Sequence, residues 1–156
     1  MISEMQGKKI AMSAIKWIGT PHVNGAKVHG KGVDCGMLLI GCLEDAGCCE
    51  KNSIDIKPYS NEWHLHHSEE WFKAYVEKYC DEIKREEIRA GDILLYQFGR
   101  CCSHGAIYVG NNMVIHSVVE QGVILSRMDD IVFMDNKGQN RLRHVYRYRG
   151  DKHGLI

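Results

Sequence analysis

Three features are scarce in this sequence, and each absence excludes a class of protein. There are only 2 prolines in 156 residues, no apolar run approaches the roughly 18 residues of a membrane span, and 20 basic residues balance 20 acidic ones. So little proline, in a chain that is 44% apolar, argues against a disordered or collagen-like protein. Without a long apolar run or a net positive charge, we expect neither membrane insertion nor specific nucleic-acid binding.

The cysteines also lack the pattern of a secreted, disulfide-bonded domain. Their number, seven, is odd, and four of them form the adjacent pairs Cys48-Cys49 and Cys101-Cys102. Neighbouring cysteines seldom bridge each other because the backbone between them is too short for relaxed disulfide geometry. Residues 1–9 contain lysines with no apolar stretch behind them, so no signal peptide is predicted. We therefore expect reduced thiols and synthesis in the cytoplasm.

No repeat or linker divides the chain, so we predict one domain over residues 1–156. Helical patterns come first and strand patterns follow. Helices are predicted over 3–18, 35–46 and 68–79. Strands are predicted over 93–98, 104–109, 113–119, 122–126 and 142–148. This segregation predicts an α+β fold in which an antiparallel sheet packs on the buried helix that starts at Cys35.

Capping residues mark the starts of the first two helices. Ser3 with Gln6 suits a capping box, and Asp34 suits the N-cap position before Cys35. The apolar face predicted for the first helix consists of Ile10, Ala14, Trp17 and Ile18. The last strand is expected to bury Leu142, Tyr146 and Tyr148 and to present Arg143, Arg147 and Arg149 to solvent.

Cys35 is the first candidate for chemistry. A thiol in the first turn of a helix lies in the positive field of the helix dipole, which lowers its pKa and prepares a thiolate nucleophile. The alternative is a small residue of the apolar core, and that describes Cys42 better, further along the same helix. A nucleophilic thiol also needs an imidazole, and His104 is the best-placed candidate because it opens a predicted strand.

His116 lies on the same face as His104 only in one register of the predicted hairpin. With a three-residue loop at 110–112, paired residue numbers sum to 222, and the two histidines are diagonal neighbours about 7 to 8 Å apart. With a two-residue Asn111-Asn112 turn the sum is 223, and they point to opposite faces. A catalytic pair therefore requires the odd loop.

Five segments in this order resemble the NlpC (NlpC and P-sixty) family of papain-like cell-wall cysteine peptidases. They are Trp17-Ile18-Gly19-Thr20-Pro21, Gly32-Val33-Asp34-Cys35, Gly91-Asp92-Ile93-Leu94, Ser103-His104-Gly105-Ala106-Ile107-Tyr108-Val109-Gly110 and Ile115-His116-Ser117. The stretch from Tyr59 to His66 is most similar to the branch associated with phage tails. The resemblance spans roughly residues 10–126, which makes it more specific than any single motif.

The resemblance implies a papain-like fold and a role for each matching residue. Cys35 matches the nucleophile, His104 the general base and acid, and His116 the residue that orients the base. Substrate-binding positions match His22, Asp34, Gly36 and Ser103, although members commonly carry Tyr where this chain has His22 and Ser where it has Gly36. The implied reaction is hydrolysis of amide bonds in peptidoglycan stem peptides through a thioester, without metal or cofactor. The backbone N–H of Cys35 is a natural oxyanion donor.

The implied substrate lies in the cell wall, so delivery by a phage tail or by lysis is expected, with phage tail proteins as partners. Three alternatives remain open. A zinc site is suggested by Cys101-Cys102-Ser103-His104 and by His64, His66 and His67, although neither cluster is followed by a second ligand pair at zinc spacing. The domain can also be an assembly module without activity, or an acyltransferase that shares the thioester.

Overall fold

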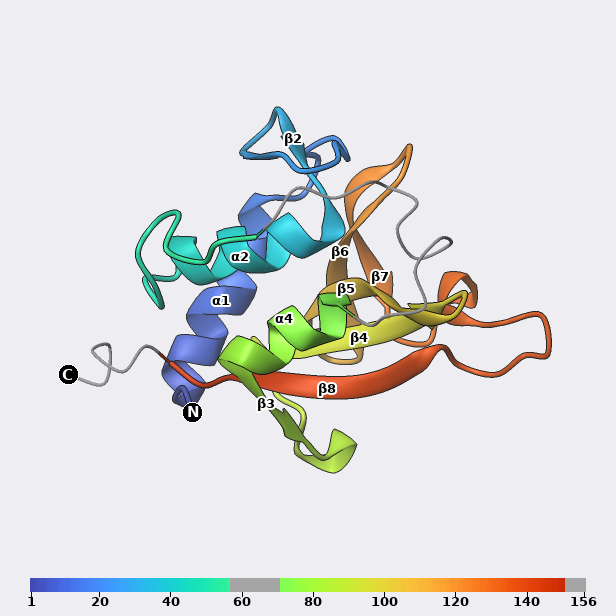
Figure 1. Cartoon of the computed structure of the whole chain (residues 1–156). Helices are drawn as coiled ribbons and strands as arrows, with labels where there is room; N and C mark the ends of the chain where they lie inside the picture. Colours follow the sequence, from blue (N-terminus) through green and yellow to red (C-terminus); the bar gives the residue numbers. More distant parts are fainter. Residues whose placement is uncertain (57–70, 151–156) are drawn as a thin grey trace.

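A six-stranded antiparallel sheet forms the centre of the fold in the computed structural model, which describes residues 1–56 and 71–150 (Figure 1). Its strand order is β3-β8-β4-β5-β6-β7. The strands are β3 (Cys80–Ile83), β4 (Ile93–Phe98), β5 (Cys101–Gly110), β6 (Met113–Val118), β7 (Gly122–Arg127) and β8 (Leu142–Tyr148). The α+β fold and the antiparallel sheet predicted from the sequence are confirmed.

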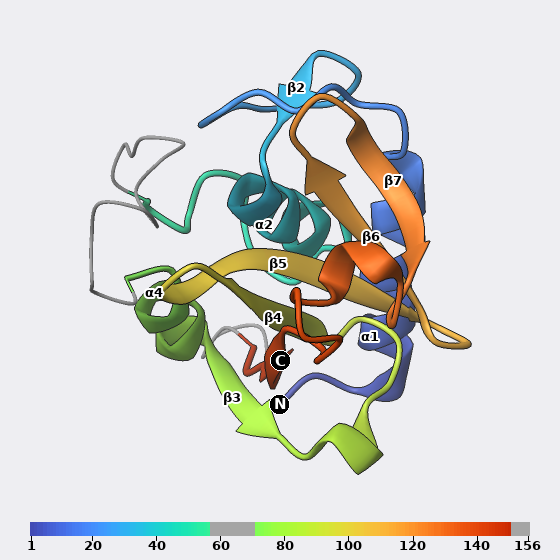
Figure 2. The same ribbon diagram turned by 90° about the vertical axis from the view of Figure 1, so that its right-hand side faces the viewer.

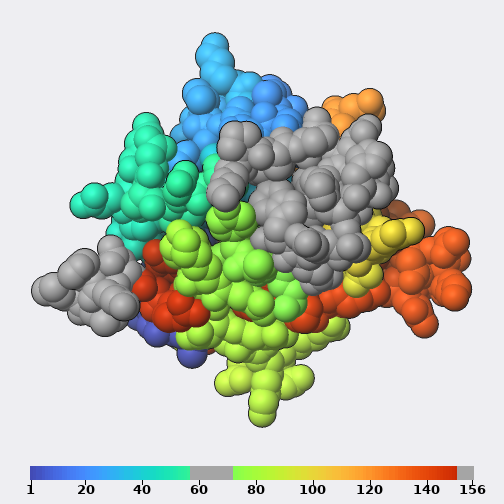
Figure 3. Space-filling view, in the orientation of Figure 1, coloured from blue at the N-terminus to red at the C-terminus, as the bar shows by residue number. Residues whose placement is uncertain are grey.

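The helices begin where capping residues predict. Helix α1 (Glu4–Lys16) has Ser3 and Gln6 in a capping box, and α2 (Cys35–Asp45) has Asp34 at its N-cap, accepting the backbone N–H of Met37. Helix α4 (Trp71–Tyr79) lies across β8, which is visible on both sides of it in Figure 3. The predicted start of this helix, at residue 68, lies outside the described residues. Within the described ranges no helix is long and apolar enough to cross a membrane.

Several short elements have weak or no sequence signals. The predicted loop over 19–33 contains the hairpin of β1 (Lys27–Val28) and β2 (Gly32–Val33). The charged stretch after α4 forms β3 and the 3-10 helix η1 (Arg85–Glu87), and a second 3-10 helix, η2 (Ile131–Phe133), lies beside β6 (Figure 2). Each is too short for a periodic apolar pattern.

The sheet buries side chains on both of its faces. One face packs on α1, α2 and α4, and the other is covered by the segment that contains η2. The helix-side core includes Ile10, Trp17, Leu38, Leu39, Ile93, Ile107, Ile115 and Tyr146. The opposite core includes Leu94, Tyr96, Ala106, Val114, Phe133, Leu142 and Val145. Ile18 belongs to neither, because α1 ends at Lys16 and leaves Ile18 45% exposed, so its predicted burial is wrong.

Strand β8 departs from the predicted alternation. The register shifts between its two pairs Leu95↔His144 and Tyr96↔Leu142, so Arg143 is an extra residue. The bulge moves Leu142 to the face opposite Tyr146. The second departure is Arg147, which is 7% exposed because it pairs with the buried carboxylate of Asp92, the residue before β4. The predicted shared face of Leu142 and Tyr146, and the solvated position of Arg147, are therefore wrong.

Helix α1 meets the start of β4 by backbone contact. A Cβ placed on Gly91 would overlap the backbone of Gly7, and one placed on Gly7 would overlap the carbonyl of Ala90. Gly91 also has a φ of 95°, which favours glycine. This close approach anchors α1 to the segment Gly91-Asp92, which leads directly into β4.

Candidate active site

The structure brings the three predicted catalytic side chains into one pocket of about 270 Å³. Cys35 stands at the start of α2, His104 on β5 and His116 on β6, and all three line the pocket. Two predicted substrate-binding residues on neighbouring segments, His22 and Ser103, line it as well. Asp34 also contributes to the wall. The N-terminal helices and the C-terminal sheet thus contribute to a common site.

The register of the β5–β6 hairpin places His104 and His116 on one face through a β-bulge that was not predicted from the sequence. Asn111 and Asn112 both have positive φ and form a two-residue turn, with Gly110 opposite Met113. The register then shifts before Tyr108, which pairs with Val114. This bulge changes the pair sum from 223 to 222 and returns His104 and His116 to one face. The predicted three-residue loop is wrong, whereas the predicted register, in which paired residue numbers sum to 222, is confirmed.

The imidazole rings are in direct contact. His104 Nε2 lies 2.8 Å from His116 Nδ1, so Nδ1 is the ring nitrogen of His104 that this contact does not use. His116 is fully buried, and the ring of Phe133 lies 4.9 Å from its ring, centroid to centroid. Burial lowers the pKa of His104 to about 3, with smaller contributions from His116 and His22, and lowers the pKa of His116 to about 4. Both rings are therefore neutral near pH 7, which is the form that accepts a proton.

The Cys35 thiol differs from the prediction in its acidity. Burial, followed by the Asp34 carboxylate, raises its pKa to about 12, although the backbone N–H groups of Gly105, Gly36 and Cys35 act in the opposite direction. The predicted lowering of this pKa is therefore wrong, because desolvation of the thiolate outweighs the backbone N–H groups and the charged neighbour is the anion Asp34, not a cation. The sulfur lies 3.6 Å from the carbonyl oxygen of Ser103, an extra residue in β5 at a bulge opposite β4. At rest the thiol is protonated and beside a carbonyl oxygen.

The other predicted binding residues are placed as follows. Both carboxylate oxygens of Asp34 accept backbone N–H groups, from Met37 at 2.8 Å and from Gly25 at 2.6 Å, so Asp34 fixes the start of α2. Ser103 Oγ lies 3.3 Å from the carbonyl oxygen of Phe98. Gly36 lines a different pocket, between α2 and α4. The roles of these residues in substrate binding stay predictions.

His22 is held by a hydrogen-bonded serine that follows His116 in β6. Ser117 Oγ donates to the carbonyl oxygen of Val33 at 2.9 Å and lies 2.7 Å from His22 Nδ1. Because the single hydroxyl proton is used on Val33, the oxygen accepts from His22, and the proton of that ring is on Nδ1. The Nε2 of His22 is then an acceptor at the pocket wall.

Three residues that hold or cover the histidines of the site were not found from the sequence. Ser126 on β7 bonds to His116, Phe133 of η2 covers the same ring, and Ser117 holds His22. Ser117 follows His116 in the motif, but serines and phenylalanines carry no signal of such roles by themselves. Only the pairing of β6 with β7 and the return of the chain through η2 bring Ser126 and Phe133 to His116.

The alternative zinc site has no geometric counterpart in the part of the chain that is described. Among residues 1–56 and 71–150, no group of three His, Cys, Asp or Glu side chains is arranged to hold a metal ion. Cys101 and Cys102 belong to the helix-side core, whereas His104 contacts His116. His64, His66 and His67 lie outside the described residues. None of the seven cysteines, all of which are described, forms a disulfide.

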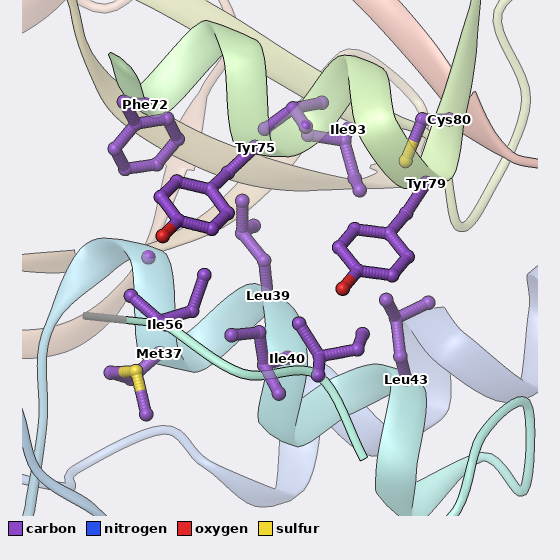
Figure 4. Close-up of a pocket in the computed structure, with 13 residues that line it drawn as sticks. Met37, Leu39, Ile40, Leu43, Ile56, Phe72, Tyr75, Tyr79, Cys80 and Ile93 are labelled. Atoms are coloured by element: carbon purple, nitrogen blue, oxygen red, sulfur yellow. The ribbon is translucent and has the colours of Figure 1, made fainter. Parts of the chain in front are cut away.

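A second pocket, of about 60 Å³, lies between α2 and α4 (Figure 4). Leu39, Ile40 and Leu43 of α2 face Phe72, Tyr75 and Tyr79 of α4 across it, and Cys80 lies at its end. Burial raises the pKa of Cys80 to about 12. Among the residues that the structure describes, the lining contains no imidazole that could activate that thiol.

Buried neutral His116 makes the protein sensitive to acid. The unfolded state binds a proton near pH 6.5, whereas the folded state does so near pH 4, so stability is lost as pH falls from 6.5 to 4. Between pH 7 and pH 5 this histidine alone lowers the free energy of unfolding by about 2 kcal/mol. We expect urea unfolding of His116→Gln to show a pH dependence smaller by that amount. Equal pH dependence in both proteins would contradict the neutral assignment.

Sequence comparison reveals relatives among enzymes of the bacterial cell wall. A family model described as the NlpC/P60 family matches residues 19–139. Murein DD-endopeptidase MepS/Murein LD-carboxypeptidase of Escherichia coli K12 is 38% identical over 63 residues, which are 40% of this chain and 32% of that protein. A probable endopeptidase of Haemophilus influenzae is 28% identical over 134 residues, 83% of this chain and 65% of that protein. The chain thus spans about a third of the first relative and less than two thirds of the second.

Solved structures share the fold. The NlpC/p60 domain of the peptidoglycan hydrolase SagA superposes with a TM-score of 0.60 at 21% identity, covering 90% of this chain and 97% of that one. A lipoprotein-like NLP/P60 family protein of Staphylococcus aureus gives 0.64 at 20% identity, covering 96% of this chain and 43% of that one. The papain-like arrangement predicted from the sequence is confirmed. Since the family model covers well over half of its residues, the chain belongs to the NlpC/P60 family.

Proposed function

We propose that the protein is a cysteine peptidase that hydrolyses amide bonds of peptidoglycan stem peptides. One observation carries the proposal: a thiol at a helix start and a pair of neutral, hydrogen-bonded imidazoles line the same pocket. The names of its relatives, a murein endopeptidase and a probable endopeptidase, support the substrate class. The three side chains take the roles of nucleophile (Cys35), base and acid (His104) and orienting group (His116).

The proposed reaction proceeds through a thioester. The Cys35 proton moves to His104 Nδ1 as the sulfur bonds to the amide carbon, and backbone N–H groups at the start of α2 stabilise the oxyanion. His104 then gives that proton to the departing amine as the carbon–nitrogen bond breaks. Water attacks the thioester with His104 as its base, and the proton returns to the sulfur as the acid product leaves. The transfer starts from a neutral thiol and a neutral imidazole.

The proposed place of action is the cell wall, because that is where the substrate lies. Delivery by a phage tail, and phage tail proteins as partners, are part of the same proposal. Residues 59–66, on which the similarity to the tail-associated branch depends, lie outside the described residues. The described pocket residues are not part of the segment on which that similarity depends.

Two alternatives share the fold and differ in outcome. An acyltransferase would form the same thioester and pass the acyl group to an amine instead of water. An assembly module would make no thioester, although the contact between His104 and His116 at 2.8 Å is then without a purpose. Product masses distinguish all three.

The test is digestion of purified peptidoglycan and defined muropeptides by the reduced wild type, with Cys35→Ala as the control. We expect new fragments whose masses show the addition of one water across the cut bond, and none with the variant. Fragments joined to an added amine would identify an acyltransferase. If neither protein changes the substrate, the peptidase proposal is wrong for this polymer.

A further inference from the structure

The hydrogen-bond chain that starts at His104 continues past His116 to the next strand. His116 Nε2 lies 2.8 Å from Ser126 Oγ, and both side chains are buried. In the pairing of β6 with β7, Val114 lies opposite Ser126 and His116 opposite Ile124. Ser126 is therefore a diagonal neighbour of His116 on the same face. Three adjacent strands, β5, β6 and β7, carry a single row of hydrogen-bonded side chains.

The proposed chemistry fixes the direction of each hydrogen bond in this row. Once His104 has taken the Cys35 proton on Nδ1, its ring carries two protons, and its Nε2–H needs an acceptor. The partner at 2.8 Å is His116 Nδ1, which accepts only if His116 has its own proton on Nε2. A buried N–H without an acceptor is costly, and Ser126 Oγ is the oxygen within hydrogen-bond distance of that nitrogen.

We propose that Ser126 is a positioning residue that fixes the tautomer of His116. Its Oγ accepts the Nε2–H of His116, which leaves Nδ1 of His116 to accept from His104 and leaves Nδ1 of His104 as the base for Cys35. Ser126 is not among the described residues that line the pocket, so it acts through His116 and does not touch substrate. The assignment rests on the proposed function, whereas the position of the proton can be measured without any activity.

Removal of the Ser126 hydroxyl is expected to exchange donor and acceptor in the hydrogen bond between His116 and His104. In Ser126→Ala, His116 keeps its buried Nε2 unprotonated and places its proton on Nδ1, where it donates to His104 Nε2. The His104 proton then lies on Nδ1, so the nitrogen proposed as the base for Cys35 is a donor. We expect kcat to fall about tenfold to a hundredfold with KM unchanged.

Three further variants separate this role from packing. Ser126→Thr keeps the hydroxyl and is expected to retain most of kcat, and Ser126→Cys, with a poorer acceptor of similar size, is expected to lie between Thr and Ala. The matched control is Ser13→Ala on α1, a buried serine that donates to the carbonyl oxygen of Lys9 and is expected to leave kcat unchanged. If Ser126→Ala does not fold, Ser126→Cys provides the kinetic comparison.

The direct test is a long-range ¹H–¹⁵N NMR spectrum of histidine-labelled protein, in which protonated and unprotonated ring nitrogens are distinguished. The His116 signals are assigned by their loss in His116→Gln. We expect the proton on Nε2 in the wild type and in Ser126→Thr, and on Nδ1 in Ser126→Ala. A wild-type proton on Nδ1 would overturn the proposal whatever the variants do, and so would wild-type kcat in Ser126→Ala.

The two proposals fail in different ways. If the wild type cuts no peptidoglycan while the His116 proton lies on Nε2 and moves in Ser126→Ala, the proposed function is wrong and the role of Ser126 stands. If the wild type cuts peptidoglycan while the proton lies on Nδ1, the peptidase stands and the role of Ser126 is wrong.

Discussion

Replacement of His104 by alanine is expected to lower kcat on a peptidoglycan stem peptide by about a thousandfold or more. The reason is the low acidity of the thiol: Cys35, with a pKa of about 12, is protonated at neutral pH, and no thiolate is present before the base acts. His104 has a pKa of about 3 and is therefore neutral, and its unprotonated ring nitrogen is the proposed acceptor of that proton. Release of new amino groups from defined muropeptides measures the loss.

The same reasoning predicts a strong departure from additivity. Cys35 and His104 act in one step, so Cys35→Ala combined with His104→Ala is expected to lose no more activity than Cys35→Ala alone. The matched control is His144→Ala on β8, a histidine that bonds to Glu82 at 2.8 Å outside the pocket, and its kcat is expected to stay unchanged. A His104→Ala protein with more than about a tenth of wild-type kcat would show that another group is the base.

The predictable part of the fold is the part that local patterns determine. Capping residues predicted the starts of α1 and α2, and strand patterns between turn residues predicted the observed bounds of β4 and β8. The order of helices before strands predicted the antiparallel sheet. These signals are local, because a cap or an apolar stripe acts within a few residues of itself.

For the candidate site, the sequence indicated which candidate catalytic residues line the pocket but neither the bulge that brings them together nor the acidity of the thiol. Cys35, His104 and His116 follow from motif and register, but the bulge that sets the register of the β5–β6 hairpin is not visible in Gly110-Asn111-Asn112. The raised pKa of Cys35 depends on burial by segments far away in the chain, which a helix start does not reveal. Ser126 was missed for the same reason, since only the pairing of β6 with β7 brings it to His116.

Gly91-Asp92, one of the segments that carries the family resemblance, serves the fold and not the pocket. Gly91 permits the close approach of α1, and Asp92 is 1% exposed. Arg147 binds the Asp92 carboxylate with two nitrogens, each at 2.8 Å, and the backbone N–H of Arg89 donates to it at the same distance. This pair ties β8 to the loop before β4. A motif shared with a family of enzymes can thus mark a buried ion pair.

Replacement of Asp92 by asparagine is expected to lower the free energy of unfolding by about 3 to 5 kcal/mol, because it leaves the buried Arg147 guanidinium without a counter-charge. The matched control is Asp81→Asn, which removes the ion-pair partner of Arg149. The side chains of Arg149 and Asp81 are 46% and 48% exposed. Loss of this exposed pair is expected to lower the free energy of unfolding by about 1 kcal/mol or less. Urea unfolding at pH 7 measures both. Equal losses in the two variants would contradict the argument, since burial is the main difference between the pairs.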